Sequence, residues 1–394
     1  MAKKPNIRFA GFEDDWEQRK VGDYLTESRE IGNKGDVARK MTVKLWGKGV
    51  YEKLEAGSTN TQYFIRHANQ FIYSKLDFLN CAFGVVPEEL ESLETTADVP
   101  AFDCVYMNPY FMFYRAIQPS FYIQNGIIAN GSRKAKRIHT DTFLEMPISV
   151  PCLTEQNKIV GYFQSLDHLI TLHQRKCDEL KKVKKFMLQK MFPKKGEKNP
   201  EIRFDGFTND WEQRKVGDIT KELSEYAKLN SGLPLLTSAR TGLMYQSDYR
   251  GNSTTDNENT LFSIVPLNAC TYRHMSDDST FHINVNTLEK GLVSKEYPVF
   301  VENESDLRFV VQYINSSDSF TKFCTEQKKG GTRTRLYYKT LCEYKMLIPS
   351  LNEQHIIADY FDNLDHLITL HQRKCEELKN VKKYMLQNMF AKGE

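Results

Sequence analysis

The chain has 394 residues and a mass of 45.8 kDa, which is too large for one hydrophobic core, so two or a few domains are expected. Hydrophobic residues make up 40% of the sequence and charged residues 27%, an ordinary composition that excludes a disordered, collagenous or wholly coiled-coil chain. The net charge of +3 and the pI of about 8.2 exclude a uniformly basic nucleic-acid-binding domain, so any surface for nucleic acid must be local.

The amino-terminal segment and the cysteines indicate where the protein works. No run of about 18 apolar residues occurs, and no apolar segment follows Lys3 and Lys4, so we expect neither a membrane span nor a signal peptide. The eight cysteines are scattered without a Cys-x-x-Cys pair, which favours reduced thiols over a disulfide framework. The sequence therefore predicts a cytoplasmic protein.

An internal duplication organises the chain. Residues 15–23 recur unchanged at 210–218, and residues 166–177 recur letter for letter at 364–375. The stretches between these frames agree only faintly. Two equal frames around unequal modules suit a scaffold with approximate twofold symmetry that presents two different surfaces to a two-part target.

The first module is expected over residues 1–150 and contains a basic loop just before its end. Mobile cations beside a donor-rich backbone are what contact with phosphate requires. We expect this loop to bind DNA, with a merely solvated loop as the alternative. Its candidate residues are Arg133, Lys134, Lys136 and Arg137.

Long helices are predicted over residues 151–195 and 349–394. Apolar residues recur three and four positions apart in both, which is typical of a coiled-coil seam. About 40 residues at ~1.5 Å each give a rod of about 60 Å. The predicted seam positions are Phe163, Leu166, Ile170, His173, Cys177 and Leu180 in the first helix and Phe361, Leu364, Ile368, His371, Cys375 and Leu378 in the second.

An apolar stripe this narrow needs a partner helix, and the simplest partner is the other copy, packed antiparallel. The alternative is that each helix packs separately on its own module. His173 and Cys177, with their repeats, could gather around zinc where the helices cross. We expect instead that they pack as seam residues, and we expect no metal site.

The second module is expected over residues 196–348 and carries an arginine-bearing stretch and a second basic loop. Reading bases requires forked donors such as arginine, which meets guanine, or amides, which meet adenine. Residues 272–274 of this module, with Tyr73 and Lys75 of the first, are secondary candidates. The main DNA-contact candidates are Thr237, Ser238, Arg240, Tyr245, Gln246 and Arg250 in the stretch and Lys328, Lys329, Thr332, Arg333, Thr334 and Arg335 in the loop.

Catalytic motifs are weak in this sequence. Residues 108–111 (Asn-Pro-Tyr-Phe) are similar to the Asn-Pro-Pro-Tyr/Phe motif of amino-methyltransferases, but the second proline and a glycine-rich cofactor loop are missing. No phosphate-binding Gly-x-x-x-x-Gly-Lys-Ser/Thr loop occurs. We therefore expect no catalytic residue in this chain.

Arranged in this order, the motifs resemble those of the specificity subunit of a type I restriction-modification system. The resemblance covers the whole chain and rests on the repeated segments 15–23 and 210–218, the Pro-x-Leu-x-Glu-Gln helix starts at Pro151 and Pro349, and the Leu-Asp-x-Leu-Ile-x-x-x-x-Arg-Lys helices. It implies an α+β fold in which two target recognition domains are joined by two long antiparallel coiled-coil helices. Each domain would read one half of an asymmetric split DNA site.

The resemblance also implies partners. These are double-stranded DNA, two modification subunits that use S-adenosylmethionine to methylate adenine, and two restriction subunits driven by ATP with Mg²⁺, while this chain itself holds no cofactor. The second module is closer to the family pattern, through residues 234–243 and 330–335, than the first, whose counterparts are 42–49 and 131–137. The alternative function is a protein-binding antiparallel clamp without DNA specificity, and an enzyme built on residues 108–111 comes third.

Overall fold

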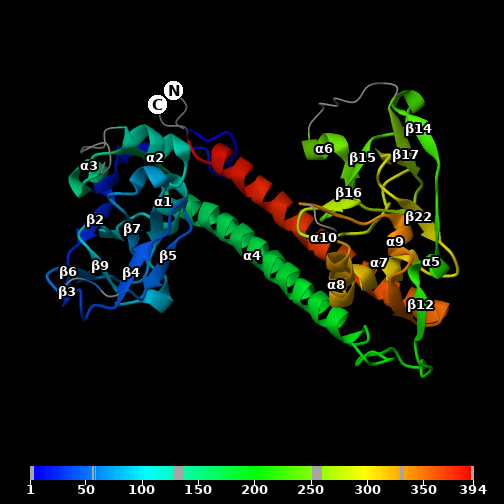
Figure 1. The fold of residues 1–394 in the computed structure, drawn as a ribbon. Helices are drawn as coiled ribbons and strands as arrows, with labels where there is room; N and C mark the ends of the chain where they lie inside the picture. Colours follow the sequence, from blue (N-terminus) through cyan, green and yellow to red (C-terminus); the bar gives the residue numbers. More distant parts are fainter. Residues whose placement is uncertain are drawn as a thin grey trace. The chain divides into compact units, whose positions relative to one another are not determined.

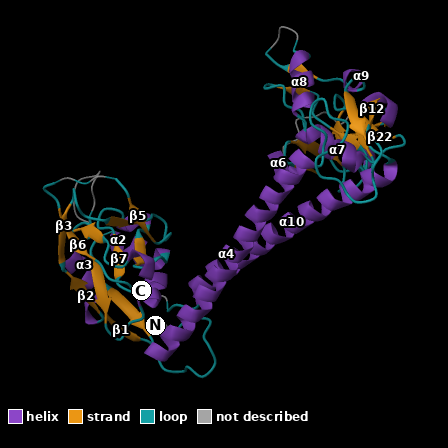
Figure 2. Cartoon of the chain, turned by 90° about the horizontal axis from the view of Figure 1, so that it is seen from below, coloured by secondary structure: helices purple, strands orange, loops and turns teal. Residues whose placement is uncertain are grey.

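A computed structural model describes residues 4–391 except Ala56, Ser58 and the segments 128–136, 251–259 and 329–331. The chain divides into two compact units. Unit 1 comprises Met1–Gln174 and Arg373–Glu394, and unit 2 comprises Arg175–Gln372, so each boundary falls within a long helix. Both units mix helices and strands (Figures 1 and 2). Over the described ranges, no helix is long and apolar enough to cross a membrane.

Unit 1 contains, in its described part, sheets of two, four and five strands, with orders β1-β11, β2-β10-β7-β8 and β3-β6-β9-β4-β5. Its strands are β1 (Glu17–Lys20), β2 (Leu25–Ser28), β3 (Ile31–Lys34), β4 (Lys40–Val43), β5 (Val50–Lys53), β6 (Gln62–Ile65), β7 (Phe71–Tyr73), β8 (Phe83–Val85), β9 (Glu94–Thr96), β10 (Ala101–Cys104) and β11 (Pro147–Val150). Its short helices are α1 (Pro109–Ala116), α2 (Pro119–Gly126) and α3 (Thr140–Leu144), with 3-10 turns η1 (Val21–Asp23), η2 (Phe78–Asn80) and η3 (Glu88–Leu90).

Unit 2 contains, where it is described, a four-stranded sheet β13-β22-β18-β20, a three-stranded sheet β14-β17-β21 and the pairs β12-β24, β15-β16 and β19-β23. Its strands are β12 (Glu212–Lys215), β13 (Thr220–Glu222), β14 (Tyr226–Lys228), β15 (Leu236–Ala239), β16 (Gly242–Tyr245), β17 (Leu261–Val265), β18 (Cys270–Thr271), β19 (Met275–Ser276), β20 (Asn284–Val285), β21 (Gly291–Ser294), β22 (Val299–Glu302), β23 (Thr334–Arg335) and β24 (Lys345–Ile348). Its short helices are α5 (Val216–Ile219), α6 (Gln246–Arg250), α7 (Leu307–Ser316), α8 (Asp318–Glu326) and α9 (Tyr338–Leu341), with the 3-10 turn η4 (Leu229–Ser231).

The two modules share one scaffold although their sequences agree only faintly. The antiparallel pair β1·β11 matches β12·β24, the sheet β2-β10-β7-β8 matches β13-β22-β18-β20, and the helices α1, α2 and α3 match α7, α8 and α9. Matching positions are filled by fully buried apolar side chains, for example Phe102 and Phe300, or Phe111 and Phe309. The shared core therefore depends on a buried apolar side chain at each of these positions, more than on which residues stand beside them in the sequence.

The long helices are α4 (Leu153–Lys190) and α10 (Leu351–Asn388), each of 38 residues and therefore about 57 Å long. Both are shorter than the predicted ranges by a few residues at each end. Their starts explain the repeated Pro-x-Leu-x-Glu-Gln motif. The Gln156 side chain donates to the Pro151 carbonyl at 3.0 Å and accepts from the Asn108 amide at 2.8 Å, and Gln354 makes the same pair of bonds with Pro349 and Asp306.

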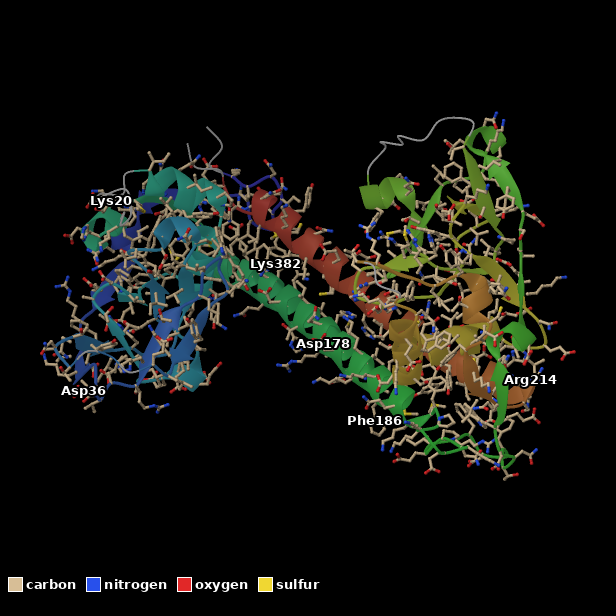
Figure 3. All side chains as sticks on the ribbon, in the orientation of Figure 1. Lys20, Asp36, Asp178, Phe186, Arg214 and Lys382 are labelled. Carbon is tan, nitrogen blue, oxygen red and sulfur yellow. The ribbon has the colours of Figure 1, made fainter. Side chains whose placement is uncertain are left out.

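Each unit contains parts of both long helices, in contact with one another. In unit 1, Phe163 of α4 stacks on Phe390, just after α10, with ring centroids 6.1 Å apart, and Lys382 of α10 donates to Asp167 of α4 at 2.5 Å (Figure 3 labels Lys382). Since higher numbers in α4 meet lower numbers in α10, these segments run antiparallel. They also contact the first module, where Phe163 packs on Tyr114 at 5.0 Å.

In unit 2 the same positions meet with their roles exchanged. Phe361 of α10 stacks on Phe192 at 5.9 Å, and Lys184 of α4 donates to Asp365 of α10 at 2.6 Å. The lysine and aspartate are the repeats of Lys382 and Asp167. This reciprocity is what two copies of one segment produce when they pack on each other.

Most of the predicted seam residues are buried in their units. The partly exposed ones are Ile170, His173, Leu180, His371 and Leu378, and the buried ones are Phe163, Leu166, Cys177, Phe361, Leu364, Ile368 and Cys375. In unit 1 the Cys375 thiol lies 3.9 Å from the Ile170 carbonyl, within reach of a weak hydrogen bond. Across the described residues, no group of three or more His, Cys, Asp and Glu side chains is placed to hold a metal ion.

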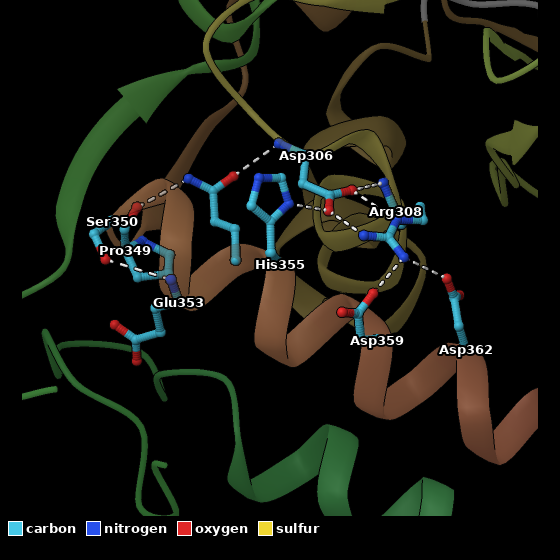
Figure 4. Close-up of polar contacts among 9 residues, drawn as sticks. Asp306, Arg308, Pro349, Ser350, Glu353, His355, Asp359 and Asp362 are labelled. Carbon is cyan, nitrogen blue, oxygen red and sulfur yellow. Dashed lines mark hydrogen bonds and ion pairs between the residues drawn. The ribbon is translucent and has the colours of Figure 1, made fainter. Parts of the chain in front are cut away.

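A polar network joins α7 to α10 in unit 2 (Figure 4). Asp306 caps α7 by accepting from the Arg308 amide, and the Arg308 guanidinium donates to the carboxylates of Asp306, Asp359 and Asp362 at 2.7, 2.6 and 3.0 Å. His355 adds a 2.7 Å contact to Asp306. One guanidinium therefore holds three carboxylates from two helices, which fixes the first turn of α7 on α10.

Two buried ion pairs, one in each unit, hold the repeated frame. Arg203 donates two hydrogen bonds to Glu353, at 2.7 and 2.8 Å, and Arg8 makes the same bidentate pair with Glu155. Both glutamate side chains are 1% exposed. The glutamate partner is the main cause of the raised pKa of each arginine. These pairs attach the segments 4–9 and 199–204 to the first turns of α4 and α10.

Replacing Arg203 with alanine should destabilise unit 2 by about 3–5 kcal/mol, because Glu353 would stay buried without its counter-charge. Chemical denaturation of the purified chain measures the loss. The matched control is Arg214→Ala, on β12 (Figure 3), since Arg214 is half-buried and has no carboxylate partner in the described part of the chain. Equal unfolding free energies for the two variants would show that the Arg203–Glu353 pair does not hold the frame.

Candidate nucleic-acid interface

The basic loop predicted in the first module is described only at its end. Arg133, Lys134 and Lys136 lie outside the described residues. Arg137 follows them, its side chain 43% exposed, and its guanidinium lies 3.6 Å from the Asp98 carboxylate. The next residue, Ile138, accepts a hydrogen bond from the buried Tyr73 hydroxyl, so the base of the loop is attached to the core of unit 1.

The arginine-bearing stretch of the second module is a hairpin with Arg240 at its tip. Strands β15 and β16 pair from Leu236↔Tyr245 to Ala239↔Gly242, which leaves Arg240 and Thr241 as the turn. Gly242 has a φ of +132°, a backbone conformation that favours glycine. The side chain of Arg240 is 61% exposed. A short hairpin of this kind presents its tip on a rigid support.

Several predicted contact residues support the hairpin from within. Ser238 is buried, and its hydroxyl accepts a hydrogen bond from Asn284 at 2.7 Å, so it does not present its hydroxyl to solvent. The Tyr245 hydroxyl donates to Glu289 at 2.7 Å, which raises the pKa of this tyrosine. Thr237 lines a cleft beside the tip. Gln246 is half-buried at the start of α6, and the side chain of Arg250 lies outside the described residues.

The second basic loop leads into strand β23. Thr334 pairs with Ser276 of β19, but its side chain is buried and bonds to the Ser279 hydroxyl at 2.6 Å, so it supports the loop and does not face solvent. Arg333 and Arg335, on either side of it, are exposed. Lys328 and Thr332 are exposed as well, and Lys329 lies outside the described residues.

The fold brings the hairpin and the second basic loop together at residues 273–282. Arg240 donates to Asp278 at 2.5 Å, and Arg333 donates to the neighbouring Asp277 at 2.8 Å. A cleft of about 330 Å³ lies at this point. Its lining includes Thr237, Ser238, Arg240, Thr241, Tyr249, Arg273, Ser276, Asp277, Thr280, His282 and Tyr297. Two stretches far apart in the sequence therefore form one polar, arginine-rimmed surface.

Sequence reasoning missed Asp277 and Asp278, because it looked for cations that contact phosphate and for donors or amides that read bases, and not for carboxylates. Asp278 accepts from the Ser276 hydroxyl, from Arg240 and from the Thr280 amide, and these donors hold the pKa of its carboxyl well below the ordinary value. The carboxylate is therefore ionised and fixed in place. The signal in the sequence was the polar run 276–279, which begins three positions after Arg273.

Some secondary predictions are wrong. Tyr73 and Tyr272 are fully buried in the cores of their units and cannot reach a nucleic acid. His274 is buried as well, stacked on Tyr337 with ring centroids 5.8 Å apart. Lys75 is half-buried, and Arg273 lines the cleft. The sequence Tyr272-Arg273-His274 alone does not indicate which of these side chains face the core.

The Asn-Pro segment at residue 108 has a structural role. The Asn108 side chain accepts from the amides of Tyr110 and Phe111 and so caps α1, and it donates to Asn157 of α4 at 2.8 Å. Its counterpart in the second half is Asp306, which caps α7. Asn108 therefore holds α1 against α4, and Asp306 holds α7 against α10.

Comparisons with known proteins agree with this organisation. The family described as type I restriction modification DNA specificity domain matches the chain twice, over residues 100–182 and 279–380. A putative type I restriction enzyme MjaX specificity subunit from Methanocaldococcus jannaschii is 25% identical over 320 residues, covering 73% of this chain and 68% of the relative.

Solved structures give similar matches. The S subunit of a type I restriction-modification system from M. genitalium superposes with a TM-score of 0.61 at 11% identity, covering 99% of this chain and 100% of that one. The HsdS subunit from Thermoanaerobacter tengcongensis gives a TM-score of 0.46 at 15% identity, with 99% of both chains covered. The first of these shows a shared fold.

His274 and His282 should lower the stability of unit 2 in mild acid. Burial lowers the pKa of both imidazoles, and Arg240 lowers that of His282 further. A histidine whose pKa is lower in the folded chain takes up a proton on unfolding. The contribution of the neutral imidazole to the free energy of unfolding is therefore complete at pH values above its pKa in the unfolded chain, ~6.5. This contribution is lost as the pH falls from ~6.5 towards the lower pKa in the folded chain.

The unfolding temperature, measured between about pH 7.5 and 5.5, should fall less in the double variant His274→Gln/His282→Gln than in the unaltered chain. The difference between the two chains is the informative quantity, because His67 in unit 1, whose pKa Glu30 and Glu91 raise, acts in the opposite direction. A decrease of the same size in both would show that these two imidazoles do not titrate on unfolding.

Proposed function

Because the chain belongs to the family of type I restriction-modification specificity subunits, we propose that it is the DNA-recognition subunit of such a complex and that each of its modules reads one half of an asymmetric two-part target. The double match to the specificity domain, once in each half, carries this proposal. One scaffold used twice with different surface loops is what a protein needs to read two different half-sites. In this proposal the chain directs adenine methylation and DNA cleavage, and partner subunits perform them.

In unit 2, Arg240 and Arg333 supply the forked donors for base reading. Arg240 lines the cleft and pairs with Asp278 at 2.5 Å, and Arg333 pairs at 2.8 Å with Asp277, which also lines the cleft. A guanine offers two acceptors, O6 and N7, to such a fork, and one good bidentate contact discriminates by about 1–3 kcal/mol. Arg335 and Lys328 lie nearby on the same loop, where they suit contact with phosphate.

The long helices α4 and α10 act as the spacer between the half-sites in this proposal. The reciprocal contacts Lys382–Asp167 and Lys184–Asp365 support antiparallel pairing of the two helices as one coiled coil. Double-stranded DNA, two modification subunits with S-adenosylmethionine, and two restriction subunits with ATP and Mg²⁺ complete the proposed complex. The chain itself holds no cofactor and works in the cytoplasm, where these partners meet DNA.

The alternative function, a protein-binding clamp without DNA specificity, differs in its response to salt. Binding to DNA releases counterions, so the affinity falls steeply as the salt concentration rises. A clamp held by protein contacts lacks this steep dependence. Titration of the complex with duplex DNA at several salt concentrations separates the two functions.

Replacing Arg333 with alanine should change one half of the recognised sequence and leave the other half unaltered. The unaltered chain and the variant are each co-expressed with a neighbouring methyltransferase-like subunit, and the methylated adenines of the host genome are mapped by long-read sequencing. We expect a split asymmetric motif that becomes degenerate at one or two positions of one half-site in the variant. Equal loss of methylation at every site would instead make Arg333 a phosphate contact.

Lengthening both long helices by one turn should widen the unread gap. One turn is inserted after Gln174 in α4 and one after Gln372, its repeat in α10, so that the paired positions stay in step. One turn adds ~5.4 Å and DNA rises ~3.4 Å per base pair, so the gap grows by about one or two pairs. The same methylation mapping measures the gap, and an unchanged gap in a folded insertion variant would contradict the spacer role.

A further inference from the structure

Three adjoining hollows of unit 2, together called the groove, lie between the arginine cleft and the carboxyl end of α4. The cleft of about 330 Å³ shares Arg240, Thr241 and His282 with a second hollow of about 570 Å³. That hollow shares Lys184, Leu188, Ser316, Asp365 and Ile368 with a third hollow of about 1470 Å³. All three are lined by unit 2 alone. Because neighbouring hollows share lining residues, they adjoin one another, and Arg240 lies at one end of the series.

The far end of this groove is strongly basic. Its lining includes eight lysines and three acidic residues, Asp318, Glu326 and Asp365, the last of which already binds Lys184. Lys190 and Lys194 are paired with Glu201. Five exposed lysines have no carboxylate partner in the described chain, namely Lys181, Lys185, Lys195, Lys322 and Lys345. Such an excess of unpaired positive charge in a concave surface attracts a polyanion.

The lysines lie on different elements, yet they face the same hollow. Lys181 and Lys185 are one helical turn apart on α4, about 6 Å along its axis. Lys322 comes from α8 and Lys345 from β24. The lining also includes the apolar residues Leu188, Phe192 and Met346. The groove thus presents charge from three elements along its length.

We propose that this groove binds the phosphate backbone of the DNA whose bases meet the Arg240–Arg333 cleft. The inference rests on the proposed function and deepens it, by assigning the general affinity for DNA to lysines that no motif identified. Continuity with the cleft favours DNA over an acidic protein segment, because a duplex engaged at Arg240 can continue along the same surface. Lysine is suited to this role, since a point charge on a flexible stem contacts phosphate without reading sequence.

The test compares two triple variants with the same loss of charge. The groove variant carries Lys181→Gln, Lys185→Gln and Lys322→Gln. The control variant carries Lys221→Gln, Lys290→Gln and Lys339→Gln, three exposed lysines of unit 2 that do not line the groove and have no carboxylate partner in the described chain. Each is purified as the complex with the methyltransferase-like subunit. Binding to duplexes with and without the methylated motif is measured across a range of salt concentrations.

Log affinity for DNA falls linearly as log salt concentration rises. We expect this fall to be shallower in the groove variant, with a slope smaller in magnitude by about 2–3, because each lost phosphate contact reduces the slope by about 0.9. Affinity should fall equally for both duplexes, and the methylated motif should not change. The control variant should keep the slope of the unaltered complex. A groove variant that behaves like the control would overturn the proposal.

Two further outcomes are distinguishable. If the groove variant no longer co-purifies with the methyltransferase-like subunit while the control does, and its slope with DNA is unchanged, the groove binds a protein and the proposal is wrong. If the unaltered complex shows no methylated motif, the recognition function fails. A reduced slope in the groove variant would then still establish the groove as a sequence-independent DNA surface.

Discussion

The sharing of two helices between two cores is the constraint on which the rest of the structure depends. Unit 1 needs Phe390, which follows α10, to complete the core around Trp16 and Phe163, and unit 2 needs Phe192, which follows α4, beside Trp211 and Phe361. Neither core is complete with one long helix alone. This requirement accounts for the letter-for-letter repeat of residues 166–177, because each position is used twice with exchanged roles, as Asp167 and Asp365 are with the lysines of the other helix.

The repeated frame is stiff, and the surfaces it carries are free to differ. Buried bidentate pairs such as Arg203–Glu353, and glutamines that fold back on the prolines before the helices, fix each module to a long helix. Unit 1 carries a five-stranded sheet where unit 2 carries a three-stranded sheet and the β15–β16 hairpin. A stiff frame with variable loops lets recognition change without loss of the cores.

The sequence predicted the parts of this arrangement that depend on periodicity and repetition. The duplication and both long helices follow from local patterns, namely the repeated segments, heptad spacing and helix punctuation. The common scaffold of the modules did not follow, because burial constrains size and polarity more than identity, as Phe143 and Leu341 illustrate at matching core positions. The convergence of Arg240 and Arg333 on Asp277 and Asp278 did not follow either. Long-range contacts between loops leave no periodic signal in the chain.

In the proposed binding of DNA by unit 2, different charged residues supply the affinity and the sequence specificity. The arginines at the cleft are neutralised by neighbouring aspartates, whereas the groove lysines Lys181, Lys185 and Lys322 have no such partner in the described chain. An unpaired lysine gains from any phosphate, so it contributes equally to every sequence. An arginine paired with an aspartate gains binding free energy only when a base offers two acceptors that match its guanidinium. A wrong base brings electronegative atoms close to the aspartate, and no new hydrogen bond offsets the repulsion. In the proposed function, the aspartates thereby convert a general attraction for DNA into a preference for one sequence.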